Sequence, residues 1–232
     1  MTAPKKSDLG VRTVSAVVMI AVAGMALWLG GWVWTVFVAA VAAGVLWEWI
    51  ALARRFAANA ISLSLWTLAG VLYVGLASAM LIYLRAPMAA QSAIVTLVLC
   101  VIATDIGAYF AGRTIGGPKI APAISPSKTW AGLIGGALAS GAVFAWLTVA
   151  YRTPGDLAPE GIPPEAVGIG AIIAVIAQAG DFFESWMKRR AGVKDSGNLI
   201  PGHGGLFDRV DGLLAVSAAA GLLFLFAGLI GR

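Results

Sequence analysis

Acidic side chains recur at helical spacing toward the C-terminal end of the chain. The spacing i, i+3, i+4, i+7, which lines up one face of a helix, is met by four polar residues: Asp181, Glu184, Ser185 and Lys188. Asp208 and Asp211 repeat the i, i+3 spacing in a later apolar segment, next to Arg209. Carboxylates that face one another from two helices repel unless a cation lies between them. Mg²⁺ fits such a place, because one or two carboxylates together with substrate phosphates typically hold it.

The position of Asp181 in the sequence favours a functional role. Asp181 lies at the end of an apolar run, where an isolated carboxylate is costly and usually functional. The alternative is charge pairing between the two helices, with Lys188 or Arg189 as partners of the two later aspartates. Spacing alone leaves both readings open.

A glycine-rich loop joins the two acidic segments. The stretch from Asp181 to Asp211 contains 10 of the 27 formal charges of the chain and its only histidine, His203. Within it, Gly204 and Gly205 free backbone N–H groups to approach phosphate oxygens, and Lys194 and His203 add charge and directional donors. This pattern indicates an anion-binding loop, although it is no Walker loop, because no G-K-[ST] follows the glycines. A flexible connector is the alternative.

A second polar group lies upstream. Asp105, Tyr109 and Arg113 follow the spacing i, i+4, i+8 along one helical face, and Asp105 lies well inside an apolar run. Its alternative role is a structural partner for Arg113 or for a hydroxyl on another helix.

The segment after this helix offers Ser125, Lys128 and Thr129 immediately before another apolar run. A helix N-terminus with hydroxyls and a lysine is a plausible anion site. Ordinary N-capping by Ser or Thr is the alternative.

The elements that must position these residues are membrane helices. The chain has 232 residues, of which 60% are hydrophobic and 12% charged, and its mean hydropathy is +0.90. Runs of about 20 apolar residues are long enough to span a bilayer. Seven such runs predict an all-α, polytopic helical bundle, with approximate spans 13–29, 32–53, 63–84, 88–110, 130–151, 167–186 and 210–230. We expect the first run to be a retained span rather than a signal peptide.

We interpret the chain as one membrane domain, 1–232. Residues 1–104 would form the N-terminal spans, and 105–232 the catalytic helices and loops. Thirteen of the 16 Lys and Arg residues fall on one side if the N-terminus is cytoplasmic, so the positive-inside rule favours that orientation. It places the loop 112–128 and the glycine-rich loop together on the cytoplasmic face. Because topology explains the cations, nucleic acid is not an expected partner.

Three segments together resemble the phosphatidate cytidylyltransferase (CDP-diacylglycerol synthase) family. The long match runs from Ser185 to Asp211 and reads S-W-M-K-R-R-A-G-V-K-D-S-G-N-L-I-P-G-H-G-G-L-F-D-R-V-D. Upstream matches are D-x-x-A-Y-x-x-G-R, from Asp105 to Arg113, and I-S-P-x-K-T-W, from Ile124 to Trp130. The sequence departs from the family at Ser127, where lysine is frequent, and at Ala131, where glutamate is frequent.

The resemblance implies that CTP condenses with phosphatidate to give CDP-diacylglycerol and pyrophosphate, with an active site on the cytoplasmic face of a bacterial-type inner membrane. Metal binding falls on Asp181, Asp208 and Asp211, and the expected ion is Mg²⁺, with a second divalent or monovalent cation left open. Catalytic roles fall on Asp181, Asp208, Lys194 and His203. Substrate binding falls on Asp105, Tyr109, Arg113, Ser125, Lys128, Thr129, Ser185, Lys188, Arg189, Asp195, Gly204, Gly205 and Arg209.

Two other functions are compatible with parts of the pattern. A CTP-dependent lipid or polyprenol kinase would use the same nucleotide with an alcohol acceptor. An ion-coupled transporter would also carry intramembrane acids, although its polar residues would gather at the midplane. The expected partners are CTP, phosphatidate and the lipid bilayer, and a homodimer is left open.

Overall fold

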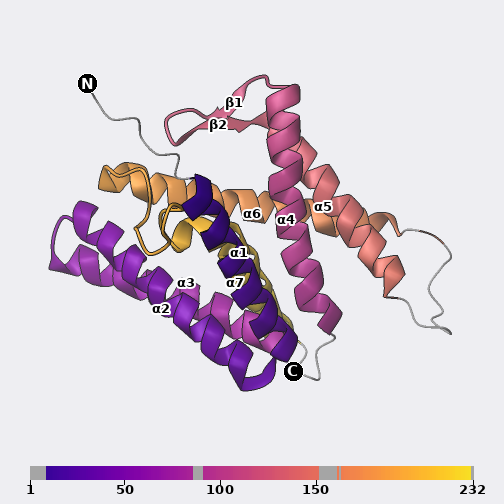
Figure 1. Ribbon diagram of the computed structural model, residues 1–232, viewed down its shortest axis with the longest axis horizontal. Helices are drawn as coiled ribbons and strands as arrows, with labels where there is room; N and C mark the ends of the chain where they lie inside the picture. Colours follow the sequence, from indigo (N-terminus) through magenta and orange to yellow (C-terminus); the bar gives the residue numbers. More distant parts are fainter. Residues whose placement is uncertain (1–8, 86–90, 152–160, 162, 231–232) are drawn as a thin grey trace.

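The computed structural model describes residues 9–85, 91–151, 161 and 163–230 of the chain. Nine elements follow one another in this part: α1 (Leu9–Leu29), α2 (Gly31–Phe56), α3 (Ala60–Leu84), α4 (Gln91–Thr114), β1 (Lys119–Ala121), β2 (Ser125–Thr129), α5 (Trp130–Ala150), α6 (Pro164–Ala191) and α7 (Phe207–Ile230). Figure 1 shows α2 and α3 side by side on one side of the molecule, α4 and α5 on the other, and α6 reaching across both pairs.

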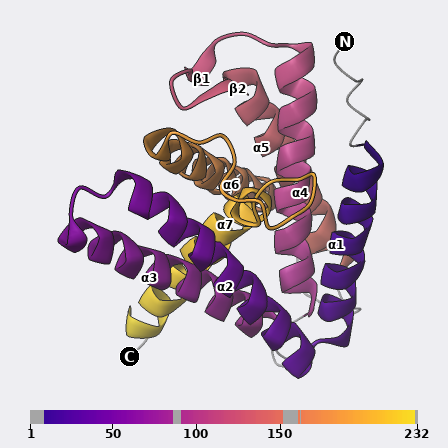
Figure 2. The same ribbon diagram turned by 60° about the vertical axis from the view of Figure 1, so that its left-hand side comes forward.

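Within the described residues, seven helices are long and apolar enough to cross a membrane. Their spans have 21 to 28 residues and mean hydropathies from 1.8 to 2.2. Many large apolar side chains on their outer surfaces are exposed, as expected where lipid rather than water is the solvent. The prediction of a seven-span, all-α membrane bundle is therefore confirmed. Figure 2 shows α1 at the edge of the molecule, and only 6% of its span is buried.

All the helices except α5 extend beyond the apolar runs at one end or both, and α6 and α4 do so where polar site residues lie. α6 continues past Trp186 to Ala191 and ends at Gly192, whose φ of 68° allows the left-handed cap. The amide of Val193 donates to the carbonyl of Lys188 at 3.0 Å, so Lys188 belongs to the helix. α4 likewise reaches Thr114 and carries Arg113. Met88, the expected start of the fourth span, lies outside the described residues.

Glycines bring α4, α5 and α6 into close contact. A Cβ at Gly107 would lie 2.5 Å from the carbonyl oxygen of Gly135, and one at Gly170 would lie 2.5 Å from that of Ser140. Such short separations are possible only for residues without a side chain, which is how small residues let membrane helices approach.

An aromatic cluster joins the other helices. Trp49 of α2 is 2% exposed, and its ring centroid lies 5.6 to 6.4 Å from those of four other rings: Trp66, Tyr73, Phe183 and Phe207. Its indole N–H donates to the Trp66 carbonyl at 2.8 Å. These contacts fix α2 and α3 against the ends of α6 and α7 that carry the acidic residues.

The segment 112–128, expected to be an irregular loop, contains a short antiparallel hairpin. β1 pairs with β2 so that Lys119 lies opposite Thr129 and Ala121 opposite Ser125. In Figure 1 the hairpin lies to the left of the upper end of α4. It meets the end of α6, where Arg189 Nε donates to the Ile124 carbonyl at 3.2 Å.

Candidate active site

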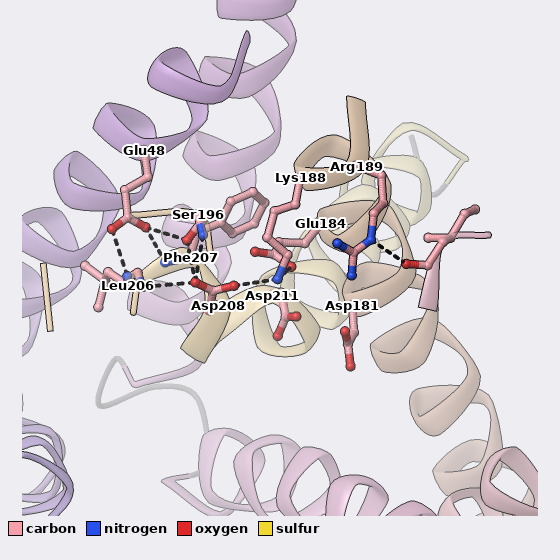
Figure 3. A network of polar contacts seen from close by, with 12 residues as sticks. Glu48, Asp181, Glu184, Lys188, Arg189, Ser196, Leu206, Phe207, Asp208 and Asp211 are labelled. Atoms are coloured by element: carbon pink, nitrogen blue, oxygen red, sulfur yellow. Dashed lines mark hydrogen bonds and ion pairs between the residues drawn. The ribbon is translucent and has the colours of Figure 1, made fainter. Parts of the chain in front are cut away.

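Three carboxylates gather where α6 and α7 meet. Asp181 and Glu184 lie one turn apart on α6, and Asp211 lies in the second turn of α7. Each offers an oxygen, and these oxygens all lie within 4.8 Å of one another. Glu184 is 1% exposed, whereas Asp181 and Asp211 are partly buried (Figure 3). We call Asp181, Glu184 and Asp211 the acidic trio.

The trio depends on a close approach of the two helices. A Cβ at Gly180 would lie 2.5 Å from the Cβ of Ala215 and 2.6 Å from the carbonyl oxygen of Asp211. Gly212 faces Ala177 in the same way, and a Cβ there would lie 3.3 Å from the Ala177 carbonyl oxygen. Residues without side chains at the contact therefore bring the carboxylates of α6 within reach of Asp211.

The acidic trio fits a divalent cation. Its three carboxylates come from two helices, and Glu184 Oε1 is buried without a hydrogen-bond partner among the described residues. Buried acceptors left unpaired are costly, and hard cations with oxygen ligands satisfy such groups. The trio could therefore hold a metal. It includes Glu184, whereas Asp208, the third metal ligand predicted from the sequence, lies outside it.

Two lysines border the trio. Lys128, from β2, forms an ion pair with Asp181, and its ammonium lies 5.0 Å from the centroid of the Phe182 ring. Lys188, from α6, lies 2.6 Å from a carboxylate oxygen of Glu184 and 2.6 Å from one of Asp208. The charge pairing weighed as an alternative is therefore present for Asp208, while the trio itself gathers more acids than cations.

Asp208 has a different set of partners from the trio. Its Oδ2 accepts from the amide and the hydroxyl of Ser196, each at 2.9 Å, and from the amide of Gly205 at 3.0 Å. Its Oδ1 accepts from Lys188. Because it lies in the first turn of α7, it also faces the positive end of the helix dipole. Its bonds to Ser196 and Gly205 hold the glycine-rich loop at the start of α7, and its ion pair with Lys188 joins α7 to α6.

The glycine-rich loop is held in a defined turn. The amide of Ile200 donates to the Gly204 carbonyl and that of His203 donates to the Ile200 carbonyl, both at 3.0 Å. Gly202 and Gly204 have φ values of 75° and 81°, which residues with a side chain rarely adopt. The loop therefore has a defined turn conformation around its glycines.

The other predicted site residues in and around the loop differ in how exposed they are. Lys194, Asp195 and Arg209 are exposed, and no ion pair or side-chain hydrogen bond joins them to other described residues. His203 is half-buried, and its Nδ1 has no hydrogen-bond partner in that same part of the chain. Ser185 is half-buried on α6. These side chains do not converge on the acidic trio by direct contact.

The upstream polar group meets the trio at a shared cavity. We call it the α4–α6 cavity; its volume is about 360 Å³, and its polar lining consists of Asp105, Tyr109, Arg113, Ser127, Lys128, Thr129, Gln178 and Asp181. Arg113 donates to the Tyr109 hydroxyl at 3.0 Å, whereas the pairing of Asp105 with Arg113, weighed as an alternative, is not found among the described residues. Asp181 thus belongs both to this cavity and to the trio.

Two hydroxyls of β2 that were predicted to bind substrate are placed differently. Thr129 Oγ1 accepts from the Gly132 amide at 3.0 Å and caps α5, so the N-capping alternative holds for this residue. Ser125 is buried in the hairpin and does not line the cavity.

Two polar residues near the candidate site were not identified from the sequence. Glu48 of α2 is 1% exposed and accepts hydrogen bonds from the start of α7. Gln178 lines the α4–α6 cavity and is 5% exposed, and its Nε2 has no hydrogen-bond partner within the part of the chain that the structure describes. Each is a lone polar residue inside an apolar run, the signal that drew attention to Asp105.

Comparison with known proteins connects both polar groups to one family. The cytidylyltransferase family pattern matches residues 10–68 and 57–227, which include the acidic trio, the loop and the cavity. The chain is 46% identical over 165 residues to the phosphatidate cytidylyltransferase of Brucella suis, covering 71% of this chain and 57% of that relative. It is 34% identical over 231 residues to the phosphatidate cytidylyltransferase of Rickettsia bellii, covering 97% and 93% of the two chains.

The length of the match differs between these relatives. The chain spans 57% of the Brucella suis protein but 93% of the Rickettsia bellii protein. The resemblance noted in the sequence is confirmed by these matches across most of the chain. On this ground, the chain belongs to the cytidylyltransferase family.

Proposed function

We propose that this protein transfers the cytidylyl group of CTP to phosphatidate and so forms CDP-diacylglycerol and pyrophosphate. The observation that carries the proposal is the family match over residues 57–227, because it contains both the acidic trio and the lining of the α4–α6 cavity. The Rickettsia bellii relative, similar over 97% of this chain, is a phosphatidate cytidylyltransferase, which supports the same activity.

The chemistry demands little proton transfer. An oxygen of the phosphatidate phosphate attacks the α-phosphorus of CTP, a new P–O bond forms, and the bond to the β-phosphate oxygen breaks as pyrophosphate leaves with its electron pair. The attacking oxygen is already anionic at neutral pH, so no strong general base is required. The difficulty is electrostatic, because two polyanions must meet in line.

The acidic trio is our candidate for the metal site. A bound Mg²⁺ would supply charge neutralisation between the attacking and leaving oxygens. Asp181, Glu184 and Asp211 would hold it, and their helical positions fix where the phosphates can approach. We assign Asp208 to holding Lys188 and the glycine-rich loop rather than to the metal, because both of its oxygens already have partners.

The α4–α6 cavity is our candidate for the triphosphate. Lys128 and Arg113 bring two cations to it, and Lys128 lies beside Asp181 of the trio. Arg189, Lys194, His203 and Arg209 of the adjoining segment remain candidates for further phosphate contacts. The acyl chains of the lipid would stay in the bilayer.

We also propose that the site faces the cytoplasm of a bacterial inner membrane. The asymmetry of the Lys and Arg residues supports this side. Because contacts join the hairpin to the end of α6, the α4–α6 cavity and the glycine-rich loop would share it. CTP would then reach the cavity from the aqueous side.

The test is a reconstitution with purified protein. We would follow incorporation of labelled CTP into lipid with phosphatidate as acceptor, in Mg²⁺ and in chelator, and run diacylglycerol and polyprenol as alternative acceptors. Metal-dependent CDP-diacylglycerol with pyrophosphate release is the expected result. Phosphorylation of an alcohol acceptor would favour the kinase instead, and folded protein inactive with every acceptor would overturn the proposal.

A further inference from the structure

A buried carboxylate on the second helix holds the loop of the candidate site. Glu48 lies in α2, is 1% exposed, and is separated by 148 residues from its partner Ser196. Its Oε1 accepts from the amide of Leu206 at 3.0 Å, and its Oε2 accepts from that of Phe207 at 2.8 Å. Figure 3 shows these bonds running from α2 to the start of α7.

The amides that Glu48 binds are those that a helix start leaves unpaired. Phe207 is the first residue of α7, and Leu206 precedes it. The first N–H groups of a helix have no partner within the helix, and a negative charge at this end is favourable. Glu48 therefore caps α7 from another part of the chain.

The loop is shaped around this carboxylate. A Cβ at Gly197 would lie 2.3 Å from Glu48 Oε1, and one at Gly205 would lie 2.6 Å from Oε2. Both glycines thus leave the space that the carboxylate fills. Their φ values are not in the left-handed region, so it is close packing, not backbone conformation, that excludes a side chain here: against Glu48 at Gly197, and against both Glu48 and the Ser196 hydroxyl, 1.9 Å away, at Gly205.

A hydroxyl connects Glu48 to Asp208. Ser196 Oγ lies 3.0 Å from Glu48 Oε2 and 2.9 Å from Asp208 Oδ2. Since a hydroxyl has one proton, the two carboxylates share a single donor at this point. Asp208 in turn binds Lys188, which contacts Glu184 of the acidic trio. The connection from α2 to the trio is continuous.

We propose that Glu48 is a positioning residue of the reaction: it fixes the glycine-rich loop and the first turn of α7, and thereby the placement of Lys188 and Asp211 at the acidic trio. Glu48 itself is not a member of the trio. The proposal rests on the proposed function for its catalytic readout, but its structural part can be tested without turnover.

The first experiment compares Glu48→Gln with Val45→Ala. The glutamine keeps the size of the side chain but presents an NH₂ group to one of the donor amides, so at least one hydrogen bond is lost. We expect kcat to fall about 10- to 100-fold, as is typical for residues that orient the ligands of a metal, with a smaller change in the KM for CTP. Val45, fully buried one turn earlier on α2, reports loss of packing alone.

The second experiment measures hydrogen exchange in wild type and both variants in detergent, without substrate. In Glu48→Gln, the amides of Leu206 and Phe207 should exchange faster, while Val45→Ala should leave them protected. If the wild type makes no CDP-diacylglycerol, the proposed function fails and this measurement still decides the role of Glu48.

Two results would overturn the proposal. Unchanged exchange at the start of α7 in Glu48→Gln would overturn it. So would a loss of kcat that Val45→Ala reproduces at the same loss of thermal stability, because that loss would reflect packing of α2 and not placement of the loop.

Discussion

The buried carboxylates around the junction of α6 and α7, including Glu48 of α2, have two different environments. Glu48 and Asp208 accept hydrogen bonds from amides, a hydroxyl and an ammonium, at distances from 2.6 to 3.0 Å. In the acidic trio, the only amide donor is that of Gly212, which donates to the preceding residue, Asp211, at 2.8 Å within the described residues. Glu184 Oε1 has no partner there at all.

This difference separates two uses of the same side chain. A carboxylate whose acceptors are filled holds other groups in place, and removing it leaves buried donors unpaired. Carboxylates that face one another repel, and their arrangement is favourable only with a cation between them. Burial alone does not distinguish the two, since Glu48 and Glu184 are both 1% exposed.

The largest expected effect follows removal of a trio carboxylate. Asp211→Asn should lower turnover about 10²- to 10³-fold, the loss typical when one preorganised charge-stabilising group is removed. Its stability in chelator should equal or exceed that of wild type, because a repulsive charge is gone. Labelled CTP incorporation and thermal unfolding in detergent measure the two quantities.

The matched control for this variant is Glu165→Gln, an exposed acid in the first turn of α6, the helix that carries the other two carboxylates of the trio. It should leave both quantities near wild type. An Asp211→Asn protein with full turnover would remove Asp211 from the metal site.

Asp208→Ala should have the opposite effect to Asp211→Asn: it should mainly lower the stability of the protein rather than its turnover. It leaves the Lys188 ammonium, whose side chain is 14% exposed, without one of its two partners, and frees the amides of Ser196 and Gly205. Breaking a buried ion pair from one side costs about 3–5 kcal/mol, so the unfolding temperature in detergent should fall clearly.

Asp195→Ala, at an exposed position of the same loop, provides the comparison for stability and should change it by less than about 0.5 kcal/mol. If Asp208→Ala unfolds like wild type but needs more Mg²⁺ for activity, Asp208 belongs with the trio and the contrast drawn above is wrong.

A third variant increases the distance between α6 and α7 without changing the charges of the acidic trio. Gly180→Ala places a Cβ 2.5 Å from that of Ala215, so α6 and α7 must move apart, and overpacking of this kind costs about 1–3 kcal/mol. The Mg²⁺ concentration for half-maximal activity should rise. Gly168→Ala adds the same methyl to α6 where nothing lies within 4 Å and should change neither stability nor Mg²⁺ dependence. Equal Mg²⁺ dependence in both variants would show that helix separation does not set the site.

Hydropathy predicts the seven spans well because about 20 apolar residues in a row have few other uses. The helix ends are less predictable, since α6 continues through Lys188 to the capping Gly192 although its charges end the apolar run. The hairpin in 112–128 escaped prediction because glycines, prolines and serines suit both loops and turns.

The composition of the trio could not be read from spacing. Asp208 and Asp211 are three residues apart, which at 3.6 residues per turn leaves their side chains about 60° apart around the helix. That rotation is enough to direct one toward the loop and the other toward α6. The contacts of Glu48 lie 148 residues or more along the chain, so only the folded arrangement reveals them.

The smallest expected effect concerns the lysine that joins the trio to the α4–α6 cavity. Lys128→Gln removes the cation paired with Asp181, whose side chain is 34% exposed, so little stability should be lost. If the triphosphate binds in this cavity, the KM for CTP should rise about tenfold, equivalent to about 1.4 kcal/mol of binding, with the KM for phosphatidate less affected. Lys119→Gln, on the other strand of the hairpin and exposed, provides the matched control. Because Lys128 also neutralises Asp181, a change in the KM for phosphatidate alone would instead place the lipid phosphate beside this lysine, and the nucleotide on the side of the glycine-rich loop.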